Sequence, residues 1–265
     1  MSIVFISCKD NHVLKDSIGF DQYILNTNHL ITVIGEYHWE KSRCKERNTK
    51  SISRYALERL SKNPNLNIYL EVDSNLIKPR RRTALLPYSI PIREIISGVV
   101  TERIYDSPVK NIIGFDIRDT LLKNYRVMLY EDDSKLTQKD ILEIKQCFYK
   151  NKDKFNICSS IYTKKVYTFL KKYLHSIENE LHKVKTRSDI YNLKIIWVKI
   201  TDFFILKNIL KKNQSNNESI VICGDYHRKN ISQCFRKLKI PNIVSKKKNN
   251  TKCIQLFETL VVNEY

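Results

Sequence analysis

Residues Leu30–Glu40 read LITVIGEYHWE, a run of apolar and β-branched residues that ends at a glycine and continues into charged and aromatic side chains. Such a run predicts a buried strand, and the glycine predicts that the strand stops abruptly. Glu36 and His38 follow the glycine, which is typical of a strand that delivers a carboxylate and an imidazole to a site. Residues Ser219–Arg228, SIVICGDYHR, repeat this Gly-acid-Tyr-His arrangement late in the chain.

The segments around the first unit predict the fold class. Strand-like runs at 67–72 and 111–117 alternate with segments of helical periodicity at 51–60 and 92–104. Alternation of strands and helices is typical of α/β proteins. We therefore expect a mixed, largely parallel central sheet that is flanked by helices.

Residues 134–213 differ from the rest because they are rich in lysine, have helical periodicity and contain neither glycine nor proline. They predict three or four helices, which we interpret as an insertion or cap between the two halves of the sheet. Strand patterns return at 220–223, 240–245 and 252–262. The whole chain, 1–265, is thus expected to form a single α/β domain with a helical insertion.

The net charge of +19 favours anionic partners such as nucleic acid, phosphate or an acidic surface. A composition rich in Lys, Asn and Ile, as AT-rich coding sequence produces, explains the same charge without a function. Arginine-rich grooves with interleaved aromatic residues, which are typical of dedicated nucleic-acid binders, are not evident. The charge alone therefore leaves both interpretations open.

The seven cysteines are scattered, odd in number and free of any C-x-x-C pair, which predicts reduced thiols in an intracellular setting. The first ten residues, MSIVFISCKD, lack the basic leader and the long apolar core of a signal peptide. The most apolar helical segment, Leu193–Leu210, is interrupted by charged residues and is not expected to span a bilayer. We expect a soluble, cytoplasmic protein without a transmembrane segment.

The ends of the predicted strands carry the residues that could do chemistry. In open α/β sheets the ligand crevice lies beyond the carboxyl ends of the strands. If the strands are parallel neighbours, four clusters meet at one edge of the sheet: Glu36 with His38, Glu71 with Asp73, Asp116 with Arg118 and Asp119, and Asp225 with His227. Imidazoles and carboxylates together suit Zn, Mn, Co or Fe. The same groups could instead act as general acids and bases without a metal.

Structural explanations compete with these functional ones. A strand-end histidine is usually structural, and it is the second Gly-acid-Tyr-His unit that favours function for His38 and His227. Glu71 lies on an apolar strand, where a carboxylate is costly unless paired, and an ion pair with Arg118 would satisfy it. Asp116 and Arg118 could likewise form a purely structural bridge. Neither His175 nor the other histidines outside the two units are expected in the site.

The two Gly-x-x-His motifs, with a glutamate-bearing strand between them, resemble the superfamily of TraB proteins, Tiki proteases, ChaN-like haem-binding lipoproteins and erythromycin esterases. Gly35-Glu36-Tyr37-His38 looks most like the Gly-Glu-x-His form of the ChaN and esterase branches. Glu71, in YLEVD, matches the strand glutamate of the family. Asp202 falls where TraB-like members carry Arg-Asp or Arg-Asn on a helix, but Thr201 replaces the arginine. Asp225 stands where many members carry a small residue.

The resemblance implies an α/β fold in which both histidines and the glutamate converge, and it implies hydrolysis, either metal-dependent peptide cleavage or ester cleavage. The leading hypothesis is a hydrolase acting on a small-molecule or peptide substrate. Its residues fall into three groups. The catalytic residues are Glu36, His38, Glu71, Asp202 and His227; the divalent-metal ligands are His38, Glu71 and His227, with Asp225 as a further donor; and the substrate-binding residues are Tyr37, Asp116, Arg118 and Tyr226.

Two other hypotheses remain open at this point. The same crevice could hold haem, a metal or a small ligand without catalysis. Alternatively, the basic charge could be the function, in a protein that binds nucleic acid. The lysine- and asparagine-rich composition would suit a large DNA virus or an AT-rich microbe, which would place a viral protein in the host cytoplasm.

Overall fold

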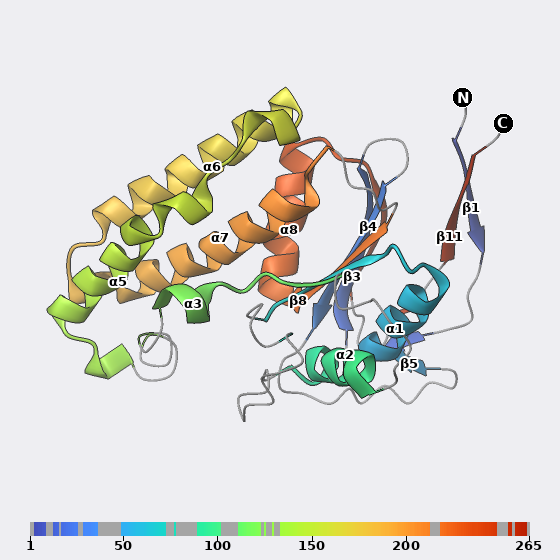
Figure 1. The fold of residues 1–265 in the computed structure, drawn as a ribbon, viewed down its shortest axis with the longest axis horizontal. Coiled ribbons are helices and arrows are strands. Elements are labelled where there is room, and N and C mark those ends of the chain that lie inside the picture. The colour runs from blue at the N-terminus through green and yellow to red at the C-terminus, as the bar shows by residue number, and fades with distance from the viewer. Residues whose placement is uncertain are drawn as a thin grey trace. The chain divides into compact units, whose positions relative to one another are not determined.

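The structure of the chain is a computed structural model (Figure 1). The residues that it describes are 3–8, 13–15, 17–25, 29–36, 49–72, 77, 89–101, 111–122, 125, 129, 133–212, 218–247, 254–255 and 258–263. The chain divides into two compact units, each described below by itself. The first consists of Met1–Glu71, Ile77–Ile113 and Ser215–Tyr265, and the second of Val72–Leu76 and Gly114–Gln214.

A six-stranded sheet forms the centre of the first unit. Its strands lie in the order β7 (Ile112–Gly114), β6 (Asn67–Leu70), β8 (Glu218–Gly224), β4 (His29–Glu36), β3 (Ser17–Leu25) and β9 (Asn242–Lys247). The central strands β6, β8 and β4 run parallel, whereas β3 is antiparallel to both β4 and β9. The expected mixed α/β fold is therefore confirmed.

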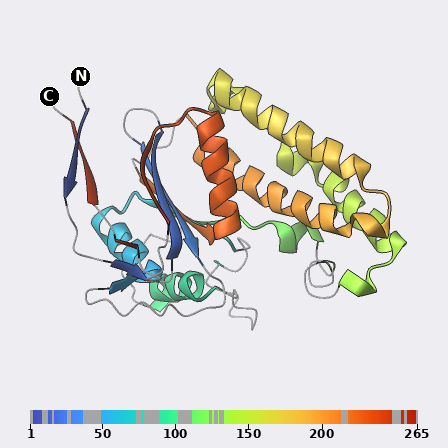
Figure 2. The ribbon, with the colours of Figure 1, turned by 180° about the vertical axis from the view of Figure 1, so that it is seen from behind.

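Helices cover both faces of this sheet, which explains why its central strands are continuous apolar runs rather than alternating ones. Figures 1 and 2 show α8 (Asp225–Lys237) on one face and α1 (Ile52–Lys62) on the other. Neighbouring residues of β3 point to opposite faces. Tyr23 accordingly meets Phe235 of α8, with ring centroids 4.7 Å apart, and Phe20 meets Tyr55 of α1 at 6.3 Å.

The predicted helix at 51–60 is α1, and its start follows from its sequence. The Ser51 hydroxyl accepts a hydrogen bond from the Arg54 backbone N–H at 3.2 Å, which satisfies a donor at the start of the helix. Ile52, Ala56 and Leu60 recur every four residues and are all buried. Helix α2 (Ile90–Thr101) packs beside α1.

Two smaller sheets complete the strands of the first unit. In one, β2 (Val13–Lys15) lies between β10 (Ile254–Gln255) and β5 (Thr49–Ser51). In the other, β1 (Ile3–Cys8) pairs antiparallel with β11 (Glu258–Asn263).

The second unit is helical. Its long helices are α5 (Gln138–Lys150), α6 (Lys164–Lys183) and α7 (Ile190–Ile209), with the short α3 (Arg118–Leu122) and 3-10 turns at 133–135, 152–155, 159–161 and 187–189. Helix α6 packs along α7. These are the helices expected over 134–213, and their interpretation as an insertion or cap stays a prediction. Among the described residues, no helix has the length and apolar character that crossing a membrane requires.

Candidate functional site

The carboxyl ends of three neighbouring strands bring two predicted site residues to one edge of the sheet. In the parallel register, Glu36 at the end of β4 is the partner of Gly224 at the end of β8. On the other side of β8, Leu70 pairs with Ile222, and the Glu71 backbone N–H donates to the Ile222 carbonyl at 3.1 Å. Glu36 is buried at this edge. Glu71 and Glu36 therefore lie on either side of the end of β8, which separates their two strands.

The side chain of Glu71 meets His227 at this edge. One carboxylate oxygen, Oε1, lies 3.1 Å from Nε2 of His227. The other, Oε2, accepts a hydrogen bond of 2.7 Å from the backbone N–H of Gly224. Only 5% of the Glu71 side chain and 6% of the His227 side chain are exposed. The two groups therefore form a buried carboxylate–imidazole pair whose carboxylate is fixed by the backbone.

His227 reaches Glu71 because β8 passes directly into α8. Gly224 ends the strand and caps the helix, and Asp225 begins α8 without an intervening turn. An acidic residue in the first helical turn is favourable because the N-terminal end of a helix carries partial positive charge. The residue pattern of 229–238 predicts a helix that starts at residue 229, which would place His227 in the turn before it. His227 lies instead in the first turn of α8.

The position of His227 beside a carboxylate has chemical consequences. A carboxylate on one ring nitrogen fixes the orientation of an imidazole and increases the basicity of the other nitrogen. Because both groups are buried, their interaction is stronger than it would be in water. Tyr226, in contrast, is 55% exposed, and its ring meets the His227 ring edge-on with centroids 6.5 Å apart.

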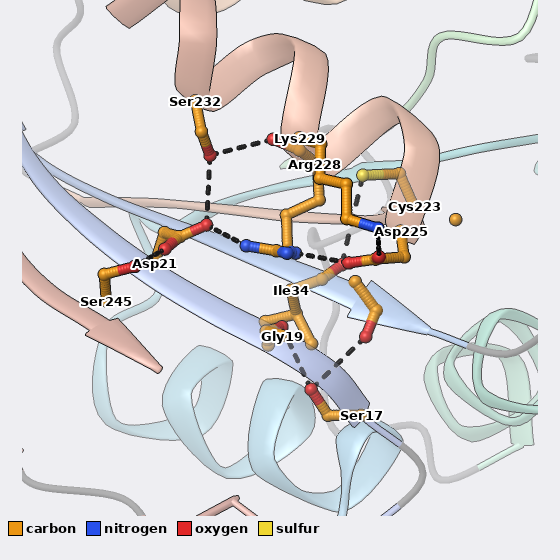
Figure 3. Close-up of polar contacts among 12 residues, drawn as sticks. Ser17, Gly19, Asp21, Ile34, Cys223, Asp225, Arg228, Lys229, Ser232 and Ser245 are labelled. Carbon is orange, nitrogen blue, oxygen red and sulfur yellow. Dashed lines mark hydrogen bonds and ion pairs between the residues drawn. The ribbon is translucent and has the colours of Figure 1, made fainter. Parts of the chain in front are cut away.

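A second polar cluster lies under the first turn of α8 (Figure 3). Arg228 is buried between two aspartates: its Nε donates to Oδ1 of Asp225 at 2.7 Å, and its Nη1 donates to Oδ2 of Asp21 on β3. Ser232 and Ser245 donate to the same Asp21 carboxylate, at 3.0 and 2.5 Å. We call Asp21, Asp225 and Arg228 the Arg228 cluster.

Arg228 and Asp225 favour each other's charged forms. Burial by itself raises the pKa of Asp225, but hydrogen bonds from Lys229 and Arg228 outweigh it and the pKa is lowered. Burial likewise acts to lower the pKa of Arg228, but Asp225 and Asp21 raise it overall. The guanidinium and the Asp225 carboxylate therefore remain ionised at neutral pH.

Two glycines make room for Arg228. Gly19 and Gly35 are partners across the antiparallel β3–β4 pair. A Cβ atom on Gly19 would lie 2.3 Å from Cζ of Arg228, and one on Gly35 would lie 2.8 Å from its Cδ. Either atom would overlap the arginine side chain. Gly35 of the first Gly-acid-Tyr-His unit must therefore be glycine, because Arg228, which directly follows His227 of the second unit, occupies the space beside it.

The sequence pattern did not identify Gly19, Asp21 or Arg228. Arg228 lies in YHRKN, which has the composition of an exposed helix face, and Asp21 lies inside a largely apolar strand. A carboxylate inside a buried strand indicates a hidden cationic partner, because an unpaired charge there is costly. That signal was available, but nothing in the sequence singles out Arg228 among the 47 lysines and arginines.

Asp116 and Arg118, predicted to bind substrate, form a buried pair in the second unit. Arg118 donates from Nε to Oδ1 of Asp116 at 2.8 Å and from Nη2 to Oδ2 at 2.9 Å. Its backbone N–H also donates to Oδ1 at 3.0 Å. This two-point contact is the structural bridge considered above for these residues. Glu71 meets His227, and Arg118 pairs with Asp116.

The remaining predicted site residues are Asp202, Tyr37 and His38. Asp202 is fully buried on α7 in the second unit, next to Thr201, whose hydroxyl donates to the Trp197 carbonyl at 3.2 Å. Tyr37 and His38 lie outside the described residues. The structure therefore brings Glu71 and His227 together, and the participation of His38 stays a prediction.

The Glu71–His227 pair also has the donor chemistry for a divalent cation. Two ligands bonded to one ion at about 2 Å each would lie roughly 3 Å apart, which is the separation of Oε1 and Nε2. Gly224 engages the other oxygen, so Glu71 would bind through Oε1 alone. Within the described residues, no three His, Cys, Asp or Glu side chains are grouped as metal ligands.

A scan against protein-family models, a search of curated proteins and a search of solved structures each returned no match for this chain.

Proposed function

We propose that the buried Glu71–His227 pair is the centre of a hydrolytic site of the TraB, Tiki and erythromycin esterase type. The observation that carries this proposal is the 3.1 Å contact between Glu71 Oε1 and His227 Nε2 at the carboxyl ends of β6 and β8. A buried carboxylate that orients an imidazole is the arrangement that general acid–base catalysis needs. The resemblance in sequence and the position of the pair in the sheet support the same assignment.

In this proposal each residue has a defined role. Gly224 holds the Glu71 carboxylate through its backbone N–H, and Glu71 in turn orients the His227 ring. His227 takes a proton from the attacking water and later returns it to the leaving group. The exposed ring of Tyr226 beside His227 would contact the substrate. Glu36 is buried at the end of β4, the strand next to β8, and its carboxyl group would affect the electrostatic potential at the site.

A divalent ion fits the same two side chains and would be held by Glu71, His227 and, as we propose, His38. When bound, the ion would polarise the scissile carbonyl and activate a water molecule. The role of Glu71 would then be to bind through Oε1 while Gly224 fixes its second oxygen. Metal content and metal dependence of turnover distinguish this form of the site from the metal-free one.

Turnover of chromogenic esters and fluorogenic peptides, with and without added Zn²⁺, Mn²⁺ or Co²⁺, tests the proposal. His227→Ala and Glu71→Gln should each reduce turnover at least 100-fold, which is within the range that acid–base and metal-ligand groups contribute. His38→Ala should do the same if His38 belongs to the site. His175→Ala is the matched control, because His175 is 73% exposed on α6. Wild-type turnover that survives in His227→Ala would reject the proposal.

A second candidate function is binding of an anion by the helical unit. An open groove of about 610 Å³ there is lined by Lys152, Lys171, Lys172 and His175 over an apolar floor that includes Phe155. Glu178 is the acidic residue of the lining, and it pairs with Lys152 at 3.2 Å. Within the described residues, Lys171 and Lys172 have no carboxylate partner. The groove could therefore take a phosphate-bearing ligand such as a strand of nucleic acid.

Binding of a fluorescent oligonucleotide at increasing salt concentration tests this candidate. A ligand held by several lysines should dissociate steeply as salt rises. Lys171→Glu combined with Lys172→Glu should reduce affinity at least tenfold, whereas Lys139→Glu, at an exposed position on α5, should have little effect. Equal loss in both variants would indicate nonspecific attraction to the +19 chain instead.

A further inference from the structure

The most constrained side chain near the proposed site is Arg228, which the proposed mechanism does not use. Only 3% of this side chain is exposed, although arginine is almost never fully buried unless paired. Its Nε and Nη1 donate to aspartates from two different elements, Asp225 on α8 and Asp21 on β3. The guanidinium is thus fixed at both ends, and it joins the first turn of α8 to the sheet.

The sheet is shaped to receive this side chain. Gly19 and Gly35 lie opposite each other on β3 and β4, and a Cβ atom on either would overlap Arg228. A side chain at Gly35 would also come within 3.0 Å of Oδ1 of Asp225. The two glycines therefore allow the guanidinium to lie directly on the backbone of the β3–β4 pair, and they set how closely α8 approaches it.

This attachment bears on His227 because the two residues are adjacent. Both lie in the first turn of α8, where the backbone is held from one side by Asp21 and Asp225 through Arg228. From the other side, Glu71 contacts the Gly224 N–H and the His227 ring. A small rotation or shift of this turn would alter the 3.1 Å contact between Glu71 and His227.

We infer that Arg228 is a positioning residue, which holds the first turn of α8 on the Gly19–Gly35 floor so that His227 meets Glu71. The inference rests on the proposed function in assigning a catalytic purpose to the Glu71–His227 contact. It predicts that a change at Arg228 disturbs the His227 ring without touching it. A merely structural role would lower the stability of the fold and leave the ring as it is.

Proton–nitrogen correlation NMR of the histidine side chains, recorded on the whole chain at one fixed neutral pH, tests this inference. The His227 ring signals are identified by their absence in His227→Ala. In the wild-type background, Glu71→Gln should shift them because the carboxylate partner is lost. In the Arg228→Lys background, the signals should already be displaced, and the further shift on Glu71→Gln should be lost. Arg236→Lys, at an exposed position on the same helix, should retain the full wild-type response.

Retention of the full Glu71-dependent shift in Arg228→Lys would overturn the inference, even if that variant melts at a lower temperature. If Arg228→Lys does not fold, Gly35→Ala provides the same comparison, since it displaces the arginine and keeps every charge. The NMR readout needs no substrate. Absence of turnover in the wild type would therefore reject the proposed hydrolysis but not this inference. Loss of the Glu71-dependent shift in Arg228→Lys would still identify Arg228 as the residue that positions His227.

Discussion

Gly19 and Gly35 are direct partners across the antiparallel β3–β4 pair, and the guanidinium group of Arg228 lies against both. Neither residue has a positive φ angle, so backbone conformation does not require glycine here. Glycine is required because a side chain would not fit. The arginine cannot move aside easily, since Asp21 and Asp225 hold it in a buried position. The effect of a substitution here therefore depends on Arg228 itself.

Gly19→Ala should destabilise the fold by about 1–3 kcal/mol, the usual cost of adding a methyl group to a filled interior. Gly35→Ala should cost less, because its Cβ would lie 2.8 Å from Arg228 rather than 2.3 Å. Urea unfolding followed by circular dichroism measures both. In an Arg228→Ala background the added cost of Gly19→Ala should disappear, which a double-mutant cycle detects. An unchanged cost in that background would show that something other than Arg228 fills the space.

Arg228→Met should lower the free energy of unfolding by about 3–5 kcal/mol. The substitution leaves two carboxylates, Asp21 and Asp225, without their shared cation, and breaking a buried charge pair from one side carries that cost. Arg236→Met on the exposed side of α8 is the matched control and should stay within about 0.5 kcal/mol of wild type. Adding Asp21→Asn to Arg228→Met should restore part of the loss. Equal stability of the two methionine variants would contradict the buried network.

The strands that carry the site could be predicted from the sequence, whereas the Arg228 cluster that holds it in place could not. Continuous apolar runs identified the strands of Leu70 and Ile222, and strand–helix alternation indicated that they run parallel, so Glu71 and His227 were expected at one edge. The start of α8 was misplaced because GDYHR has no helical periodicity, whereas Asp225 favours a first helical turn. Arg228 was missed for a different reason. Its burial depends on the register between β3 and β4 and on two glycines, which no periodicity in the sequence encodes.

The Asp225 carboxylate should make stability depend on pH in the acid range. Its pKa is lowered in the folded chain, because hydrogen bonds from Lys229 and Arg228 outweigh the effect of burial. A lowered pKa means that the stabilisation is fully present above the unfolded value, about 3.9, and is lost as the pH falls towards the folded pKa. Wild type and Asp225→Asn should therefore differ most in unfolding free energy at neutral pH and converge below about pH 4. A difference that stays constant down to pH 3 would contradict this assignment.

Glu71→Gln should separate the two forms of the proposed site. The amide oxygen of glutamine can still accept the hydrogen bond from Gly224, so the junction of β8 and α8 keeps its contact while the charge is removed. If a divalent ion binds here, its affinity should fall by more than the roughly 10–100-fold that loss of an outer-shell partner costs, because Glu71 would bind the ion directly; Zn²⁺ or Co²⁺ titration followed by calorimetry measures it. Glu180→Gln is the control, because it makes the same change of atoms in the half-buried Glu180–Lys199 pair of the helical unit. Equal affinities of wild type, Glu71→Gln and Glu180→Gln would place any metal binding away from the Glu71–His227 pair.

If the wild type shows no measurable metal binding, the same variants test the metal-free form of the site. Loss of turnover in Glu71→Gln but not in Glu180→Gln would then support acid–base catalysis by His227.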